Sequence, residues 1–101
     1  MAITPEAVAR LRDAVLKGPG LLDPQLRAAA FGRATLPHPL GSYVAKVRTQ
    51  AYQITDADVD ALRAAGYSED QIFEATVCAA VGLGLRQLER GLNALQGGQG
   101  R

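Results

Sequence analysis

Residues 75–85 carry no charged side chain, and most of their side chains are small. Ser68, followed three residues later by Gln71, is a capping-box pattern that predicts the start of a helix just before this stretch. After it, leucines recur at spacings of three and four, with polar residues between them: Leu85, Leu88, Leu92 and Leu95. Such spacing is typical of one face of a helix. The pattern therefore predicts one long helix over residues 69–95.

The first half of this helix is apolar on every side, so it must be covered on every side, by helices of the same subunit or by other subunits. Gly82 and Gly84 lie within it. Each mid-helix glycine costs roughly 1 kcal/mol of helix propensity relative to alanine. We expect close contact with a neighbouring helix at both glycines to offset this cost. The prediction is a central helix whose segment 75–85 is enclosed by other helices, with Cys78 shut away inside.

Shorter helices are predicted before the long one. Thr4-Pro5 and Asp23-Pro24 each place a capping residue directly before a proline, which is the arrangement favoured at the first position of a helix. The apolar residues that follow each pair recur at helical spacing. Two prolines within residues 35–41 constrain the backbone there. We expect two helices, followed by a stiff, extended connection.

Apolar residues at helical spacing predict a third helix over residues 42–52. Thr55 begins a capping pattern for a fourth helix, which Gly66 ends. No stretch alternates between apolar and polar residues as a half-buried strand does. We therefore expect an all-α fold, a compact bundle of about five helices around one long C-terminal helix. It should form a single domain over residues 1–95, with residues 96–101 as a flexible tail.

Composition narrows the range of partners. The chain has 101 residues, of which 48% are hydrophobic and 5% aromatic, so the core should consist of Ala, Val and Leu. Its net charge of +1 gives no global attraction to nucleic acid. The uncharged stretch is shorter than the about 20 apolar residues that a membrane span needs. The N-terminus lacks the pattern of a signal peptide, which predicts a cytoplasmic protein.

Cys78 is the only cysteine, so neither an intrachain disulfide nor a Cys-x-x-Cys pair can form within one subunit. Glu74 precedes it by four residues and therefore shares its helix face, where a carboxylate could accept a proton from the thiol. Burial in an uncharged helix would instead raise the thiol pKa and make it inert. Cys78 and Glu74 are the candidate catalytic pair, and a buried structural cysteine is the favoured interpretation. No Cys/His cluster predicts a metal site, and no motif implies a cofactor.

Tyr43, Tyr52 and His38 are the candidate ligand-binding residues. Tyrosines can line a small-molecule pocket with an apolar body and a polar tip, and an imidazole between two prolines could do acid–base work. Tyrosines at helix ends more often seal the rim of a core, and an isolated histidine is usually not catalytic. Arginines near the C-terminus are too few to predict phosphate binding, and a solvated helix face explains them. These are Arg86, Arg90 and Arg101.

Residues 52–74, YQITDADVDALRAAGYSEDQIFE, together with the small-residue helix that follows, resemble the carboxymuconolactone decarboxylase and alkylhydroperoxidase-D-like superfamily. The resemblance covers less than half the chain. It implies an all-helical subunit that assembles into homo-oligomers. Peroxidase members carry Cys-x-x-Cys followed by His on the helix before the Gly-Ser turn, and the matching positions here hold Ala51, Ile54 and Asp58. Cys78 lies after the turn, so no catalytic role carries over to it, and the histidine of the decarboxylase-like members has no match either.

Three functions remain open from the sequence. The favoured one is a small cytoplasmic homo-oligomer with a binding or structural role, assembled through residues 75–85, without redox chemistry. The alternative is a one-cysteine peroxidase-like or decarboxylase-like enzyme that uses Cys78 and Glu74. The third is a carrier of a small-molecule ligand, with a pocket rimmed by Tyr43, Tyr52 and His38. Nucleic acid and membrane partners are not expected.

Overall fold

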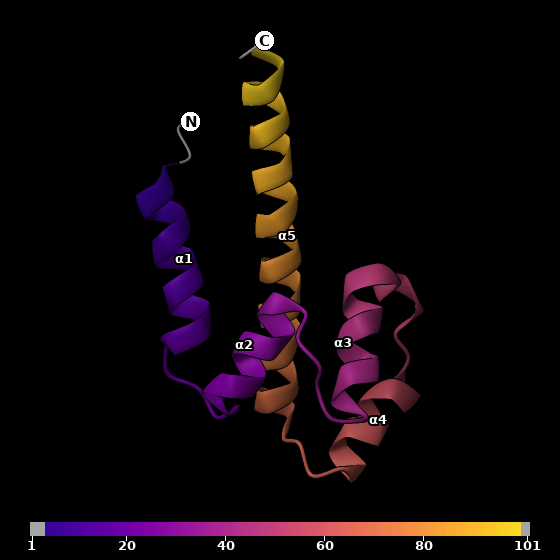
Figure 1. Ribbon diagram of the computed structural model, residues 1–101. Helices are drawn as coiled ribbons and strands as arrows, with labels where there is room; N and C mark the ends of the chain where they lie inside the picture. The colour runs from indigo at the N-terminus through magenta and orange to yellow at the C-terminus, as the bar shows by residue number, and fades with distance from the viewer. Residues whose placement is uncertain (1–3, 100–101) are drawn as a thin grey trace.

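The computed structural model describes residues 4–99, and within them every regular element is a helix (Figure 1). The elements are α1 (Pro5–Lys17), α2 (Pro24–Gly32), α3 (Leu40–Thr49), the short 3₁₀ helix η1 (Ala51–Gln53), α4 (Asp56–Ala64) and α5 (Glu69–Gln99). The predicted all-α fold with five α-helices and a long C-terminal helix is confirmed. No helix within the described residues is long and apolar enough to cross a membrane.

Local capping starts four of these helices where the sequence predicts. Thr4 Oγ1 accepts a hydrogen bond from the Ala7 amide at 3.1 Å. Ser68 and Gln71 form the reciprocal pair expected of a capping box, with N–O distances of 2.9 and 3.1 Å. The Asp23 side chain accepts from the Gln25 amide at the start of α2, and Thr55 forms a second capping box with Asp58 at the start of α4. These side chains satisfy amides at the helix start that have no partner inside the helix.

Two helix ends differ from the prediction. α3 begins at Leu40 and ends at Thr49, because the completely buried side chain of Leu40 anchors its first turn and the non-helical backbone at Gln50 breaks the helix. η1 then occupies the stretch where the helix was expected to continue. α5 continues to Gln99 instead of ending near residue 95, since adding a turn to a formed helix costs little. Most of the predicted tail is therefore helical, and residues 100–101 lie outside the described part of the chain.

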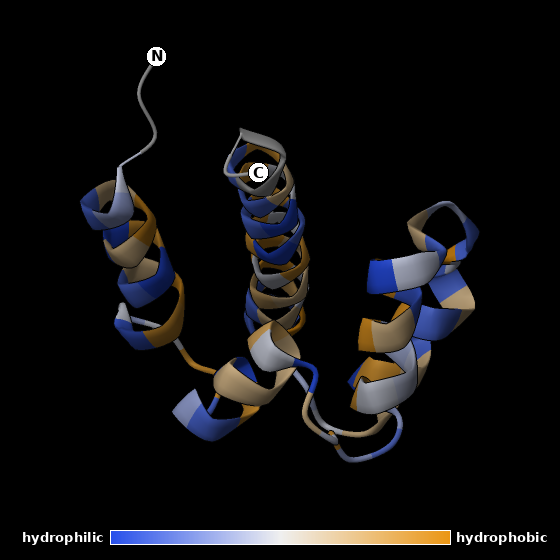
Figure 2. Ribbon diagram, turned by 45° about the horizontal axis from the view of Figure 1, so that its top comes forward, coloured by the Kyte–Doolittle hydropathy of each residue, from blue (hydrophilic) through white to orange (hydrophobic). Residues whose placement is uncertain are grey.

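The core lies where α2 and α3 pack on the N-terminal half of α5. α1 lies on one side of α5, and α3 and α4 lie on the other (Figure 2). As the composition predicts, the core is rich in Ala, Val and Leu; its buried members are Leu22, Ala30, Leu40, Tyr43, Val44, Leu62, Ile72, Ala75, Cys78 and Ala79. α1 contributes no buried residue and joins α5 partly through an ion pair of 3.4 Å between Arg12 and Glu89.

The expected enclosure of residues 75–85 is only half correct. Gly82 is buried, and a Cβ built on it would lie 2.2 Å from the carbonyl oxygen of Phe31, so α2 does approach α5 closely there. Gly84 is exposed and has no neighbouring atom within 4 Å of a built Cβ, so the predicted close contact at Gly84 is wrong. The two glycines are about 200° apart around the helix and cannot face the same neighbour.

The uncovered side of α5 forms a continuous stripe, which we call the α5 seam. Its residues recur at spacings of three and four and none is buried: Phe73, Val77, Ala80, Gly84, Leu88, Gly91 and Leu95. Beyond the core only α1 accompanies the C-terminal half of α5, and the chain reaches 53 Å along its longest axis (Figure 1). Its radius of gyration, 15.4 Å, exceeds the about 13 Å usual for 100 residues.

Candidate functional site

Cys78 lies on the core face of α5 with only 1% of its surface exposed. Its thiol donates a weak hydrogen bond to the carbonyl oxygen of Val15 in α1, at 3.8 Å. Burial raises the pKa of the Cys78 thiol, and the nearby charge of Arg27 opposes this increase only in part. Because the thiolate is the reactive form of cysteine, this environment disfavours the reactive form of the sulfur. The structure thus agrees with a buried, structural cysteine.

Glu74 is occupied by a structural task. Its carboxylate accepts hydrogen bonds from the amide of Leu21, at 2.8 and 3.1 Å, and from the amide of Leu22, at 3.0 Å. A Cβ built on Gly20 would lie 2.0 Å from this carboxylate, so a larger residue there would displace the Glu74 side chain from its present position. Gln71 also donates to the carbonyl of Leu21, at 3.3 Å. The first turns of α5 therefore hold the loop that leads into α2.

Arg27 is the one buried charged residue among those described, with 6% of its surface exposed. It donates to the carbonyl of Gly18 at 2.8 Å and so fixes the end of α1 against the start of α2. Arg27, Glu74 and Cys78 all border a cleft of about 210 Å³ between α1 and α5, whose other lining residues are Ala14, Val15, Pro19, Phe73 and Val77. The sequence places no basic residue near Cys78, and only the fold brings Arg27 there.

This cleft lacks the geometry of a nucleophile with its base. Such a pair is recognised by a hydrogen bond of about 2.6–3.2 Å between the two groups. Within the described residues the Cys78 thiol bonds to a backbone carbonyl, and the Glu74 carboxylate bonds to backbone amides. Cys78 and Glu74 therefore border the same cleft, but no hydrogen bond joins the thiol to the carboxylate.

The candidate ligand residues lie in different surroundings. Tyr43 is 8% exposed, and its hydroxyl shares a hydrogen bond of 2.7 Å with Thr76 of α5. It lines a cleft of about 390 Å³ between α3, α4 and α5, and neither Tyr52 nor His38 borders that cleft. Tyr52 is 82% exposed on η1, and His38 is exposed beside Ser42, with 3.3 Å between its Nδ1 and the Ser42 hydroxyl. The three do not form the expected rim of one pocket.

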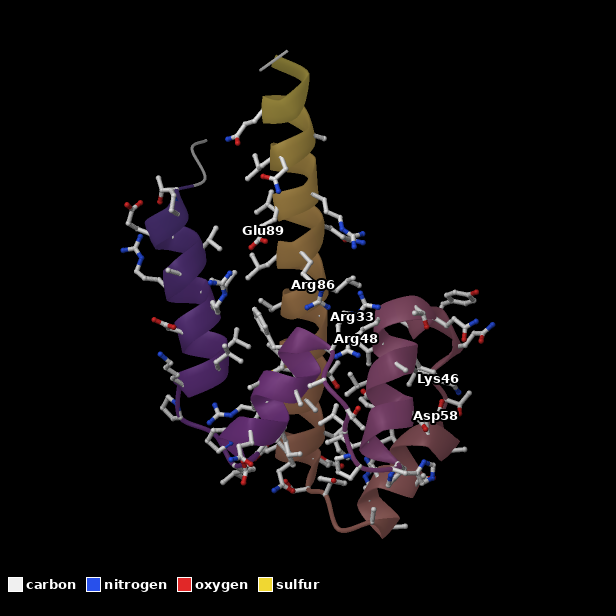
Figure 3. The ribbon with its side chains drawn as sticks, viewed as in Figure 1. Arg33, Lys46, Arg48, Asp58, Arg86 and Glu89 are labelled. Carbon is white, nitrogen blue, oxygen red and sulfur yellow. The ribbon has the colours of Figure 1, made fainter. Side chains whose placement is uncertain are left out.

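A site that the sequence did not predict lies between the C-terminus of α2, α3 and α5. Arg33, Arg48 and Arg86 converge there from three different elements (Figure 3). Together with Ala45, Thr49 and Leu83 they line a depression of about 260 Å³, which we call the arginine cleft. Arg48 donates to the carbonyls of Ala29 and Ala30, and Arg86 donates to that of Phe31, so both bind the last turn of α2.

The charges in the arginine cleft are not neutralised by the chain. No carboxylate among residues 4–99 forms an ion pair with Arg33, Arg48 or Arg86. Desolvation lowers the pKa of Arg48, and the positive charges of Arg86 and Arg33 lower it further. Desolvation likewise lowers the pKa of Arg86, and the positive charges of Arg33 and Arg90 lower it further. Nε of Arg48 and Nη2 of Arg86 are buried without a hydrogen-bond partner in the described part of the chain.

The prediction that these arginines form a solvated helix face is therefore wrong for Arg86. Arg90 is exposed, as that prediction requires, and Arg101 lies outside the described residues. One signal could have corrected it. Gly82 and Arg86 are four residues apart and share a helix face, so an arginine at that position continues the face that packs on α2. The contributions of Arg33 and Arg48 follow only from the tertiary fold.

An ion pair outside the arginine cleft joins α3 to α4. Lys46 of α3 contacts both carboxylate oxygens of Asp58 of α4, at 2.9 and 3.0 Å (Figure 3). The hydrogen bond from Lys46, followed by that from the Thr55 amide, lowers the pKa of the Asp58 carboxyl. This contact ties α4 to α3, and the same Asp58 carboxylate also accepts from the Thr55 amide in the capping box of α4. Across residues 4–99 no three His, Cys, Asp or Glu side chains cluster as a metal site would require.

Comparison with protein-family models, with curated proteins and with solved structures found no match to this chain.

Proposed function

We propose that this protein is a homo-oligomeric helical protein with a binding or structural role, whose subunits associate along the α5 seam. The observation that carries the proposal is the seam itself. It runs from Phe73 to Leu95, about 33 Å at 1.5 Å per residue, and those two end residues are 68% and 65% exposed. Scattered exposed apolar residues are normal, whereas a contiguous apolar stripe marks an interaction surface.

The glycines of the seam support an occupant that is itself a helix. Gly84 and Gly91 have no neighbouring atom within 4 Å of a built Cβ, so neither serves packing inside the subunit. Each nevertheless costs roughly 1 kcal/mol of helix propensity. Together with the small side chain of Ala80, they form a shallow groove in which another helix could approach closely. A second α5 would offset the cost, just as α2 does at Gly82.

α1 supports the same arrangement because it is amphipathic yet buries no residue. Leu11, near its middle, is 45% exposed, and Leu92 on the neighbouring part of α5 is 38% exposed. α1 and the C-terminal half of α5 therefore offer two adjacent apolar faces without a third helix between them (Figure 2). Two copies could combine these faces into a bundle of four helices, which is a stable way to cover such surfaces. This places the interface further along α5 than residues 75–85 alone.

The surroundings of Cys78 favour this role over the enzymatic alternative. A peroxidase-like or decarboxylase-like reaction at Cys78 with Glu74 needs an accessible thiolate and a free base. The raised pKa of the Cys78 thiol disfavours the thiolate. The Glu74 carboxylate already accepts hydrogen bonds from two backbone amides, so it is not a free base. The resemblance of residues 52–95 to the carboxymuconolactone decarboxylase and alkylhydroperoxidase-D-like proteins also implies homo-oligomers, and on this proposal the chain would retain their assembly without their chemistry.

Light scattering coupled to size exclusion tests the proposal. The wild-type protein should elute with the mass of at least two copies at tens of micromolar concentration. Gly84→Glu should shift the mass toward that of one copy, because a two-fold interface would bring the two introduced carboxylates together. Asn93→Glu adds the same charge to an exposed position of α5 outside the seam and should leave the mass unchanged. A wild-type protein with the mass of a single copy would refute the proposal.

A further inference from the structure

The three side chains of the arginine cleft exceed what the fold requires at that place. The C-terminus of a helix carries about half a negative charge, and one cation near it is the usual complement. Here Arg48 and Arg86 already donate to three carbonyls of the last turn of α2, and Arg33 adds a third positive charge. The local charge therefore stays strongly positive, with no carboxylate of the described residues paired to it.

Arg33 is the residue that a structural explanation leaves unexplained. Its side chain makes no hydrogen bond within residues 4–99, and its backbone has φ of 71°, in the left-handed region. Gly or Asn ordinarily occupies that position after a helix, because a larger side chain is disfavoured there. Asn would fit the left-handed backbone at the end of α2 better than Arg does, so the backbone does not explain the arginine. Its contribution is its charge at the mouth of the cleft.

We propose that the arginine cleft binds a small phosphate-bearing anion, held jointly by Arg33, Arg48 and Arg86. Guanidinium groups match the geometry of phosphate oxygens with paired N–H donors. All three guanidinium-bearing residues line the cleft, and the carbonyl contacts of Arg48 and Arg86 hold their two groups in position. The volume of about 260 Å³ lies just below that of drug-sized pockets, which suits a compact anion. The overall charge of +1 disfavours an extended polyanion.

The cleft and the proposed interface are independent. Arg86 and Gly84 are two residues apart on α5 and therefore about 200° apart around its axis. An anion in the cleft leaves the α5 seam free, so the site can be present in a monomer or in an oligomer.

Titration calorimetry of the full chain with inorganic phosphate and, separately, with glycerol 3-phosphate tests the site, with sodium chloride at equal ionic strength as the blank. At least one of the two ligands should give saturable binding and raise the melting temperature. Tighter binding of glycerol 3-phosphate would identify an organic phosphomonoester as the ligand, and tighter binding of phosphate would identify the free ion. No saturable binding of either up to about 10 mM, an affinity weaker than specific sites show, would overturn the proposal.

Arg33→Asn is the decisive variant, because Asn accepts the left-handed backbone and both arginines on the carbonyls of α2 stay in place. It should bind at least about tenfold more weakly, as expected for the loss of one charge-assisted contact. Arg10→Gln removes the same charge from an exposed position of α1 and should bind as the wild type does. Equal affinity in Arg33→Asn and the wild type, or an equal loss in both variants, would overturn the site.

Discussion

Gly82→Ala adds one methyl group where α2 and α5 approach most closely. A Cβ at this position would lie 2.2 Å from the carbonyl oxygen of Phe31, 2.9 Å from its carbonyl carbon and 3.0 Å from its Cα. All three are backbone atoms, so no side chain can rotate away, and α2 itself must move. Overpacking costs about 1–3 kcal/mol, and a clash with backbone that cannot rotate away belongs to the upper part of that range, about 2–3 kcal/mol. The better helix propensity of alanine returns roughly 1 kcal/mol.

The net effect of Gly82→Ala should be a loss of about 1–2 kcal/mol of unfolding free energy. For a domain of this size that corresponds to a melting temperature lower by roughly 5–15 °C. Thermal unfolding followed by circular dichroism, with urea titration for the free energy, measures both quantities. The change should not depend on protein concentration, because the contact with Phe31 lies within one subunit.

Gly84→Ala is the matched control, since it makes the same chemical change in the same helix where a Cβ meets no atom within 4 Å. The subunit alone should gain up to about 1 kcal/mol from the improved propensity. If copies meet along the α5 seam, the added methyl would weaken their association, and the melting temperature would then change with concentration. A melting temperature of Gly82→Ala equal to or above that of the wild type would refute the close approach of α2 to α5.

Two further predictions concern titration and reactivity. The pKa of the Asp58 carboxyl is lowered, so the bonds it makes to Lys46 and to the cap of α4 stabilise the fold above its ordinary pKa of about 4 and are lost as the pH falls through the lowered value. Asp58→Asn should therefore lower the melting temperature at neutral pH and lose less stability than the wild type on acidification, and parallel acid profiles would contradict this. Cys78 should react slowly with a thiol reagent at neutral pH in the native protein and rapidly in denaturant, because burial raises the thiol pKa. Rapid native labelling would instead support the enzymatic alternative.

Helix starts were predictable because capping is local. Each of the patterns at Thr4, Asp23, Thr55 and Ser68 involves residues no more than three positions apart, and each forms the predicted bonds. The side chain and the amide that it satisfies are fixed by the same turn of backbone, so neighbouring helices have little influence. The burial of Cys78 was predictable for a similar reason, because an uncharged helix segment must place part of its surface in a core.

The side of α5 that the core covers could not be predicted, since a helix that is apolar all round gives no direction to its neighbours. Gly82 and Gly84 look equivalent in the sequence, and only the position of α2 distinguishes them. The arginine cleft has the same origin. Arg33, Arg48 and Arg86 are distant in sequence, and each alone resembles an ordinary surface or helix-end cation. Their convergence depends on how α2, α3 and α5 pack, which local patterns do not encode.

Under the proposed association, α5 would have two separate tasks on opposite sides. Its core side holds α2 through Glu74, Gly82 and Arg86, each of which contacts the loop before α2 or the helix itself. A change on that side alters the fold and the shape of the arginine cleft together. The seam makes no such contacts within the subunit, so a charge introduced at Gly84 should abolish association and leave both the fold and anion binding intact. Loss of anion binding in Gly84→Glu would mean that the cleft is completed only by a second copy, which is a measurable departure from the independence that the helix geometry implies.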